Sequence, residues 1–402
     1  MEVRAGGFQG DVLWLTSGYP WSGDEVQLSF HRTVVQALAS SGISIRVISP
    51  IPAAPWPLPL LNRRWARYAA TPRSYRDAGI PVDRPRFVAV PSLPKWSRPE
   101  SGIARAVLHA LRRADRIALV HSHFAFPIAP AGKIVADRLG VPHVVTVHGS
   151  DINTWPASHR HQLAAVVETL RSADALIAVS AALAERTKAL CGRRPEVIYA
   201  GINIRVFTAG LPDRAEARRI LGLESDRFFA LFVGDLIRQK GAFRLADAVL
   251  LAGDAVSCLI AGEGPGLGYR ADVAGGRIRY LGVKSSPDVA LLMRAADALV
   301  LPSESEGLGQ VLVEAGAVGT FAIASPIGGI PEVIGDGRGL LLEDLSPASI
   351  ASALEATAAR PGDTAGSVAA LQEYVGAHFD ADKNSCRLVA VYERVLSRRN
   401  VA

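Results

Sequence analysis

The segment Leu301–Glu314 has the sequence LPSESEGLGQVLVE, in which an apolar run ends, a small glycine-containing loop follows, and a helical pattern begins near Gly309. Glu306 lies in the loop and Glu314 on the first helical turns. Exposed amides of a loop that opens a helix can bind phosphate oxygens or sugar hydroxyls. Carboxylates beside them can accept hydrogen bonds from vicinal hydroxyls. On spacing alone, a capped helix with two surface acids explains the segment equally well.

The same order of strand, loop and helix is repeated along most of the chain. In the first half, several of the short runs are apolar throughout, as strands covered on both faces should be. The predicted strands there are Val12–Thr16, Ser44–Ser49, Ile117–His121, His143–Val147, Ala175–Val179 and Val197–Tyr199, and the helices are Phe30–Ala39, Ile128–Leu139 and His161–Leu170. Strand and helix alternation of this kind predicts a doubly wound parallel α/β sheet.

The second half starts the alternation again after a candidate linker at 201–213. Its predicted strands are Phe228–Val233, Ser257–Ala261, Ile278–Tyr280, Ala298–Leu301 and Phe321–Ala324, and its helices are Phe243–Leu251, Val289–Ala295 and Val311–Val318. Ser367–Phe379 and Asp382–Leu396 have helical patterns as well. We therefore expect Rossmann-like domains at 1–203 and 204–379, followed by a C-terminal helix at 380–402 that packs back on the first domain. Two such sheets place ligands beyond the carboxyl ends of their strands.

Other candidate site residues also follow predicted strands. Phe232–Gly241 (FVGDLIRQKG) places Lys240 at a helix start, where it can neutralise a diphosphate, although a solvated lysine explains that position too. Val144–Asp151 (VVTVHGSD) places His148 just after a strand, where a neutral imidazole can donate a hydrogen bond. Taken alone, a histidine after a strand is more often structural.

These segments together resemble the retaining GT-B glycosyltransferases, specifically glycosyltransferase family 4. Leu301–Glu314 is similar to that family's Glu-x7-Glu signature, and His148–Asp151 to its His-Gly-x-Asp motif. Ala315–Glu332 and Gly335–Leu342 match as well, so the resemblance covers almost the whole chain in order. It implies a GT-B fold, in which two Rossmann-like domains with parallel sheets face each other across a cleft and C-terminal helices follow.

The resemblance also implies roles for individual residues. Glu306 would touch the donor sugar, and Glu314 would bind the ribose hydroxyls. His148 would lie near the C6 hydroxyl of the sugar and, with Glu306 and Lys240, forms the expected catalytic set. The other residues expected to bind the donor are Gly23, Arg238, Val283, Leu308 and Gly309. On the acceptor side the resemblance implies His121, His123 and Asp151, although a packing role is as good an explanation for His121 and His123.

The implied reaction is retaining hexosyl transfer from a nucleotide-diphosphate sugar, with UDP and GDP as the candidate nucleotides, to a saccharide or lipid-linked acceptor. No cofactor or metal is expected, because relatives need none and the sequence has no metal-binding motif. Asp235 departs from the family pattern, which has an arginine directly after the glycine; Arg238 is the candidate to replace that charge. A GT-B nucleotide-sugar epimerase and a non-catalytic sugar-nucleotide-binding relative remain alternatives.

Charge is unevenly distributed along the 402 residues. Residues 1–200 hold 24 Lys and Arg against 14 Asp and Glu, whereas the remainder holds 20 against 24. The segment Trp56–Arg76 contains five arginines, two tryptophans and no acid, a composition typical of binding to anionic lipid. A solvated loop and helix face is the alternative. With no apolar run long enough to span a bilayer and no signal peptide, we expect a cytoplasmic protein at the inner face of the membrane. Nucleic-acid binding is not expected, because no recognition motif accompanies the positive charge.

Overall fold

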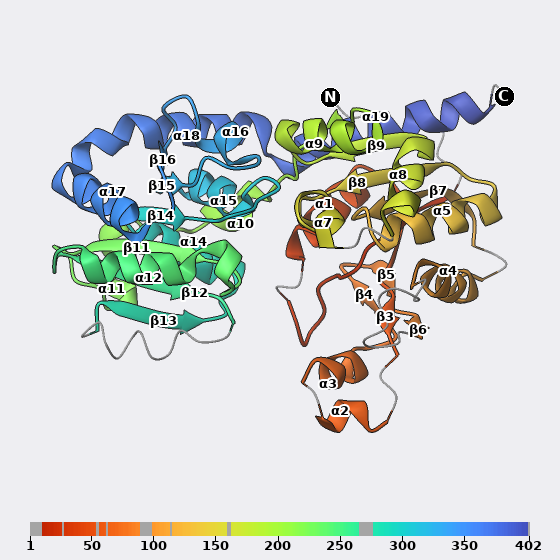
Figure 1. Ribbon diagram of the computed structural model, residues 1–402, viewed down its shortest axis with the longest axis horizontal. Coiled ribbons are helices and arrows are strands. Elements are labelled where there is room, and N and C mark those ends of the chain that lie inside the picture. The colour runs from red at the N-terminus through yellow and green to blue at the C-terminus, as the bar shows by residue number, and fades with distance from the viewer. Residues whose placement is uncertain are drawn as a thin grey trace. The chain divides into compact units, whose positions relative to one another are not determined.

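The computed structural model describes residues 10–25, 28–53, 56–61, 63–88, 99–112, 115–158, 162–264 and 276–400. Figure 1 shows the chain, which divides into two compact units, each built on one large sheet. Met1–Ala200 and Ala381–Ala402 form the first unit, and Gly201–Asp380 forms the second. The C-terminal residues therefore belong to the same unit as the N-terminal half.

The main sheet of the first unit is parallel except at one edge. Its strands are β1 (Asp11–Leu15), β2 (Ile45–Ile48), β4 (Ser74–Asp77), β5 (Ile80–Asp83), β7 (Ile117–His123), β8 (His143–Val147), β9 (Ala175–Ala178) and β10 (Glu196–Val197). They are ordered β10-β9-β8-β7-β1-β2-β5-β4, and only the pair β4–β5 is antiparallel. Two short strands, β3 (Ile51–Pro52) and β6 (Arg86–Phe87), form a separate parallel pair.

Helices cover both faces of this sheet, as the all-apolar strands require. Val12 and Trp14 of β1 belong to one core, which includes residues of α1 (Ser29–Ser40) and α19 (Ala381–Asn400). Leu13 and Leu15 belong to the opposite core, with residues of α4 (Pro99–Ala110) and α5 (Ile128–Leu139). This division follows from the two-residue period of a strand. The remaining helices are α2 (Leu58–Leu61), α3 (Arg63–Ala70), α6 (Ser150–Asn153), α7 (Trp155–Ser158), α8 (Leu163–Ser172) and α9 (Ala181–Cys191).

The second unit contains a sheet that is parallel throughout. Its strands are β11 (Phe228–Val233), β12 (Val256–Ala261), β13 (Ile278–Gly282), β14 (Ala298–Leu301), β15 (Phe321–Ala324) and β16 (Leu340–Leu341). They are ordered β13-β12-β11-β14-β15-β16, the strand order of a dinucleotide-binding Rossmann fold. The direction of strand succession reverses between β11 and β14, and ligands of such sheets bind at this reversal.

Helices in the second unit follow nearly every strand. They are α10 (Ile204–Thr208), α11 (Arg214–Leu221), the 3-10 helix η2 (Arg238–Lys240), α12 (Ala242–Leu251), α14 (Ser286–Ala295), α15 (Gln310–Val318), α16 (Ile330–Ile334), α17 (Pro347–Ala359), the 3-10 helix η3 (Pro361–Thr364) and α18 (Ala365–His378). The candidate linker 201–213 contains α10, which packs on α14 and α15, so that segment is part of the second unit.

The structure confirms the strands and helices predicted from the sequence and adds others. The bounds of β8, β11, β14, β15 and α5 are those predicted, whereas α8 begins at Leu163, past residue 161, which lies outside the described residues. The hairpin of β4 and β5 and the helices α4, α9 and α17 were not predicted. Across the described ranges, every helix is too short or too polar to cross a bilayer.

Candidate functional site

Two loops at the strand-order reversal of the second sheet carry the charged residues predicted for catalysis. The loop after β11 leads to Lys240 in η2, and the loop after β14 contains Glu306. Lys240 Nζ donates to Glu306 Oε1 over 2.8 Å, and Ser303 Oγ donates to the same oxygen over 2.9 Å. The Glu306 side chain is only 9% exposed, against 31% for Lys240. The fold therefore joins two motifs 66 residues apart in one ion pair.

Glycines allow these loops to pack backbone against backbone. Gly241 follows Lys240 with φ of 86°, and a Cβ there would lie 2.2 Å from the carbonyl oxygen of Pro302. Gly328 has φ of 53°, and a Cβ there would lie 2.1 Å from the carbonyl oxygen of Glu306. Only glycine fits either position without moving the backbone. Lys240 and Glu306 are thus held at a fixed separation by the main chain as well as by their ion pair.

Helix α15 begins directly after the Glu306 loop. Gly309 is its N-cap residue in the left-handed conformation, with no side-chain cap. Among the described residues, none accepts a hydrogen bond from the amide of Leu308 or Gly309, so both can serve an anion at this helix N-terminus. Glu314, one turn further on, is half-buried, and desolvation raises the pKa of its carboxyl to about 8. At neutral pH this carboxyl therefore holds its proton.

The other second-unit residues predicted to bind the donor are exposed. Val283, directly after β13, is 49% exposed, and Arg238 is exposed in η2. Asp235 is exposed as well, and in the described parts of the chain its carboxylate has no ion-pair partner within reach. The negative charge at the family's arginine position is therefore not neutralised by Lys240, whose partner is Glu306.

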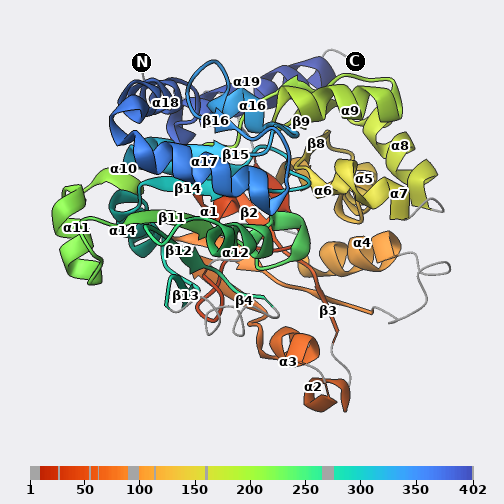
Figure 2. The same ribbon diagram turned by 60° about the vertical axis from the view of Figure 1, so that its left-hand side comes forward.

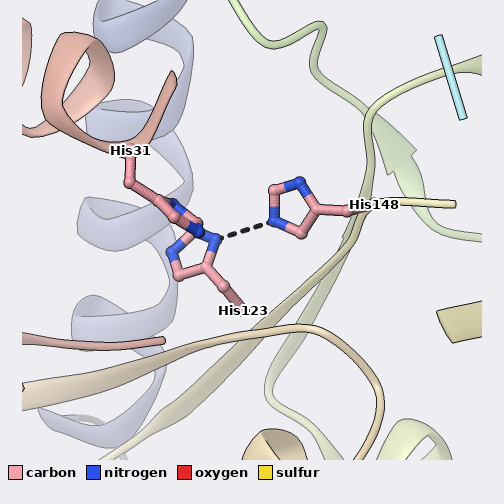
Figure 3. A group of neighbouring side chains, drawn as sticks. All are labelled: His31, His123 and His148. Carbon is pink, nitrogen blue, oxygen red and sulfur yellow. Dashed lines mark hydrogen bonds between the residues drawn. The ribbon is translucent and has the colours of Figure 1, made fainter. Parts of the chain in front are cut away.

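In the first unit, two of the predicted histidines contact each other at the carboxyl end of the sheet. His123 ends β7 and His148 follows β8, and His123 Nδ1 lies 3.0 Å from His148 Nε2 (Figure 3). The ring of Phe124 packs on His148 with centroids 4.6 Å apart, and Phe124 itself has φ of 77°. That left-handed conformation is costly for a bulky residue, which is typical of a position shaped for function.

His121 and Asp151 support this pair from inside the unit. Asp151 is buried and accepts hydrogen bonds from the backbone amides of Ala125, His148 and Gly149 at 2.7–3.3 Å. His121 is fully buried, with one ring nitrogen 2.7 Å from the Tyr392 hydroxyl of α19 and the other 2.8 Å from Thr146 Oγ1. Both were predicted on the acceptor side. In the structure their polar atoms are engaged within the unit: Asp151 holds the backbone of the loop that carries His148, and His121 links β8 to α19.

Burial keeps these histidines neutral. Desolvation lowers the pKa of His148 to about 3 and that of His121 and His123 well below the usual value, and neighbouring histidines lower the latter two further. Burial raises the pKa of Asp151, and the amide hydrogen bonds oppose that effect. A neutral imidazole donates one hydrogen bond and accepts another. His148, only partly buried, can therefore donate to a hydroxyl without carrying a charge.

Gly23 lies in an exposed turn of the first unit, closed by backbone hydrogen bonds between Trp21 and Asp24. A Cβ on Gly23 would meet the Trp21 ring at 2.3 Å. A larger residue at position 23 would therefore require the Trp21 indole to move. Its predicted approach to a diphosphate stays a prediction.

The sequence interpretation missed His31, which belongs to the same cluster. It lies on the first turn of α1, fully buried, with Nε2 2.8 Å from Thr16 Oγ1 at the end of β1. Its ring lies near those of His123, His148 and Trp14. A histidine on the apolar face of a helix does not by itself indicate a functional site. The available hint was that the helix carrying His31 follows β1, the strand next to β7, which carries His123.

Two Rossmann-like units in one chain, the second with charged loops at its strand-order reversal, are the architecture of the GT-B class of proteins. The chain belongs to the group 1 glycosyltransferases of family 4. The family model "Glycosyl transferases group 1" matches residues 213–363, and the model "Glycosyltransferase Family 4" matches residues 30–206. The expected GT-B fold and family are thereby confirmed.

Curated relatives extend over most of the chain. The putative teichuronic acid biosynthesis glycosyltransferase TuaC of Bacillus subtilis is 34% identical over 388 residues, which cover 96% of this chain and 98% of the relative. D-inositol 3-phosphate glycosyltransferase 1 of Catenulispora acidiphila is 31% identical, over 79% of this chain and 80% of the relative. These similarities place glycosyl transfer on this chain.

Solved structures share the fold at lower identity. Anabaena Alr3699/HepE in complex with UDP superposes with a TM-score of 0.72 at 20% identity, covering 96% of this chain and all of that one. Sucrose-phosphate synthase from Thermosynechococcus elongatus superposes with a TM-score of 0.77 at 20% identity, with the same coverage. Similarity at this level shows the GT-B architecture.

Proposed function

We propose that the protein is a retaining, metal-independent hexosyltransferase that moves a sugar from a UDP- or GDP-sugar to a saccharide or lipid-linked acceptor in the synthesis of a cell-surface polysaccharide or glycolipid. The name of the TuaC relative supports a role in polysaccharide synthesis. The UDP and UDP-glucose complexes of HepE support a nucleotide-sugar donor. The first unit is then the acceptor-binding domain and the second the donor-binding domain.

The observation that carries this proposal is the Lys240–Glu306 ion pair at the strand-order reversal of the second sheet. The leaving diphosphate gains negative charge as the bond to the sugar breaks, and a preorganised cation beside it stabilises that charge. Lys240 and the N-terminus of α15 supply positive charge there, and Arg238 adds more from η2. Glu306 orients the ammonium group of Lys240 and offers a carboxylate to the hydroxyls of the donor sugar.

The first unit contributes a neutral hydrogen-bond donor. His148 binds a hydroxyl of the donor sugar, while His123 holds its ring and Asp151 holds its backbone. The acceptor hydroxyl attacks on the face that the diphosphate leaves, and the diphosphate takes its proton, so the anomeric configuration is retained. No protein nucleophile takes part.

The test is nucleotide release by the purified full-length chain, given a panel of UDP-, GDP- and ADP-sugars with and without lipid extract from its host. Release from one donor that requires the extract establishes transfer. Glu306→Gln should abolish most of it. Glu304→Gln, an exposed acid in the same loop that pairs with Arg244, is the matched control and should keep it. Full activity in EDTA is expected for a metal-independent enzyme. A product with the same anomeric configuration as the donor, measured by NMR, is expected for a retaining one.

Other outcomes would refute the proposal. Conversion of the donor to an epimer without any acceptor would indicate an epimerase. Binding of a nucleotide sugar with no release in any extract would indicate a non-catalytic relative, and Asp235 would then be the first residue to examine.

We also propose that α2 and α3 bind the anionic surface of the membrane, which places the protein at its cytoplasmic face. Figures 1 and 2 show these helices together, projecting from the body of the first unit beyond β3 and β4. Trp56 is 82% exposed and Leu60 75% exposed, and Arg64 is exposed beside Tyr68. Exposed aromatic and basic residues on one projecting element suit the lipid headgroup region. Arg67 contributes less positive charge to this surface, because it forms an ion pair with Asp24.

Sedimentation with vesicles of phosphatidylglycerol and phosphatidylcholine tests this surface. A Trp56→Ala, Arg64→Glu double variant should lose most of its bound fraction. Arg205→Glu, an exposed arginine of the second unit, should keep it. Equal loss in both variants would show a general charge effect and refute a specific surface.

A further inference from the structure

Three histidines from separate elements of the first unit come together at the carboxyl end of its sheet. Figure 3 shows His31 from α1, His123 from β7 and His148 from the loop after β8, with their rings directed toward one another. Each offers one ring nitrogen such that the three lie within 4.8 Å of one another. In the described parts of the chain, this is the group of side chains whose spacing suits a bound metal ion.

The hydrogen bonds around His31 leave one of its nitrogens as a bare acceptor. Thr16 Oγ1 donates to the carbonyl oxygen of Gly18 over 3.2 Å, so its lone pair accepts from His31 Nε2–H at 2.8 Å. His31 Nδ1 therefore carries a lone pair, and it is buried without a hydrogen-bond partner among the described residues. A metal-ligating histidine commonly has its other nitrogen fixed in this way by a neighbouring polar group.

His123 is only partly satisfied as well. Its Nδ1 shares one hydrogen bond with His148 Nε2, and its Nε2 is buried with no partner within the described ranges. A neutral imidazole has one donor and one acceptor nitrogen, so either tautomer of His123 leaves a buried polar atom unpaired. Such atoms are costly, and a cation bound between the rings would use their lone pairs.

The environment meets the other requirements of a metal site. The three imidazoles are held in the neutral form, which is the form that binds metals. His148 is only partly buried and offers an entry path. The buried Asp151 carboxylate accepts from the His148 amide, and its negative charge would partly balance a divalent cation. Tetrahedral zinc needs its nitrogens about 3.4 Å apart, and one nitrogen of each ring already lies within 4.8 Å of the other two, so small movements of the rings complete the geometry.

We propose that His31, His123 and His148 form a binding site for one divalent transition-metal ion, and that the bound ion inhibits glycosyl transfer. Three imidazoles favour Zn²⁺, Co²⁺, Ni²⁺ or Cu²⁺ over Mg²⁺ and Ca²⁺, which prefer oxygen ligands. Inhibition rests on the proposed function: the ion is held through the His148 nitrogen that faces the cluster, and its positive charge and bound water lie beside the ring that is proposed to bind the donor sugar. Water completes the coordination, and the site leaves the basal reaction metal-independent.

Direct binding is the first test. The full-length, untagged protein is titrated with Co²⁺, whose visible absorption reports nitrogen coordination in tetrahedral geometry, and Zn²⁺ affinity is measured by competition with a chromophoric chelator. One ion per chain is expected, with no response to Mg²⁺. An absence of Co²⁺ absorption bands, or several weak equivalents per chain, would overturn the site.

The variants separate the ligands from other histidines. His148→Gln removes a ligand at a partly exposed position, and His31→Gln removes Nδ1 while its amide can still reach Thr16. Each should weaken Zn²⁺ binding by more than the about 10–100-fold expected for Thr16→Val, which removes only the hydrogen bond that orients His31. His143→Gln is the control, because His143 is a buried histidine of the same sheet that bonds Ser122 and lies outside the group. Equal weakening in His143→Gln, with thermal melting unchanged in all variants, would overturn the assignment.

Inhibition is measured separately, as nucleotide release with and without Zn²⁺. Loss of activity that EDTA restores, in the wild type and in His143→Gln, supports the inhibitory role. Thr16→Val leaves all three histidines in place, so it should keep activity and need about 10–100-fold more Zn²⁺ for the same inhibition. One-to-one binding without inhibition would uphold the metal site and contradict the contact of His148 with the donor sugar. Absence of binding alongside normal transfer would overturn the metal site alone.

Discussion

Replacing Lys240 by methionine tests whether the Lys240–Glu306 ion pair acts as one unit. The substitution keeps most of the side-chain volume and removes the ammonium group that donates to Glu306 Oε1 over 2.8 Å. A hydrogen bond to a charged group is worth about 1.5–3 kcal/mol. Since Lys240 is 31% exposed, water replaces part of that interaction, and we expect the coupling between the two side chains to lie near the lower end of this range.

The larger effect is expected on the reaction. If Lys240 faces the charge that develops on the leaving diphosphate, its loss should lower kcat by about 10²–10³-fold, or about 2.7–4 kcal/mol, as for removal of other preorganised donors. The donor KM should change much less, because this charge is fully developed only in the transition state.

The assay is nucleotide release by Lys240→Met, Glu306→Gln and the double variant, with Glu304→Gln as the control from the same loop. Contacting residues that act together give a coupling energy of about 0.5–3 kcal/mol in such a cycle. Additivity within about 0.5 kcal/mol would show that Lys240 and Glu306 act independently, which refutes this reasoning. A fall in donor affinity with kcat unchanged would refute the transition-state role of Lys240.

Three further outcomes are expected. Desolvation raises the pKa of Glu314 to about 8, and ribose hydroxyls donate to the ionised carboxylate. Nucleotide affinity, measured by calorimetry, should therefore rise by up to about tenfold per pH unit toward pH 8 and then become constant. The Glu314→Gln variant should show no such rise. Asp235→Arg should tighten nucleotide binding several-fold in a salt-sensitive way, whereas Asp226→Arg, at the opposite end of β11, should not; equal effects would indicate general electrostatics. Tyr392→Phe should destabilise the first unit by about 1–3 kcal/mol, since it leaves a buried nitrogen of His121 unpaired, and an unchanged melting temperature would contradict that hydrogen bond.

The sequence predicted the strands best where they are central in the sheet. β11, β14 and β15 are uniformly apolar, and β8 is buried along its whole length, because helices cover both of their faces. The hairpin of β4 and β5 lies at the sheet edge, where arginine is exposed at position 76 and aspartates at 77 and 83 are only partly buried. Those residues break the apolar run, so the hairpin gave no recognisable strand pattern.

The sequence identified the loops that form the candidate site but not the contacts between them. The resemblance to a family picked out Lys240 and Glu306, but their contact depends on β11 and β14 being neighbours, and strand order is not encoded locally. Likewise, the sequence placed His123 and His148 after strands and could not show that β7 and β8 are adjacent. His31 was missed because the helix that carries it has an ordinary amphipathic pattern, and only the third dimension directs its ring toward the other two.

The polar side chains at the carboxyl ends of the two sheets differ in charge. In the second unit the side chains at the strand-order reversal carry charge: Lys240 is partly exposed and pairs with Glu306. In the first unit burial removes charge, so that His123 and His148 meet as neutral rings. A diphosphate needs a cation and a sugar hydroxyl needs a neutral hydrogen-bond partner, which are the roles proposed above for Lys240 and His148. A neutral imidazole can hydrogen-bond to a sugar hydroxyl, and it also has a lone pair that can bind a metal ion. For this reason the histidine cluster can take part in the reaction and also be the place where a metal ion inhibits it.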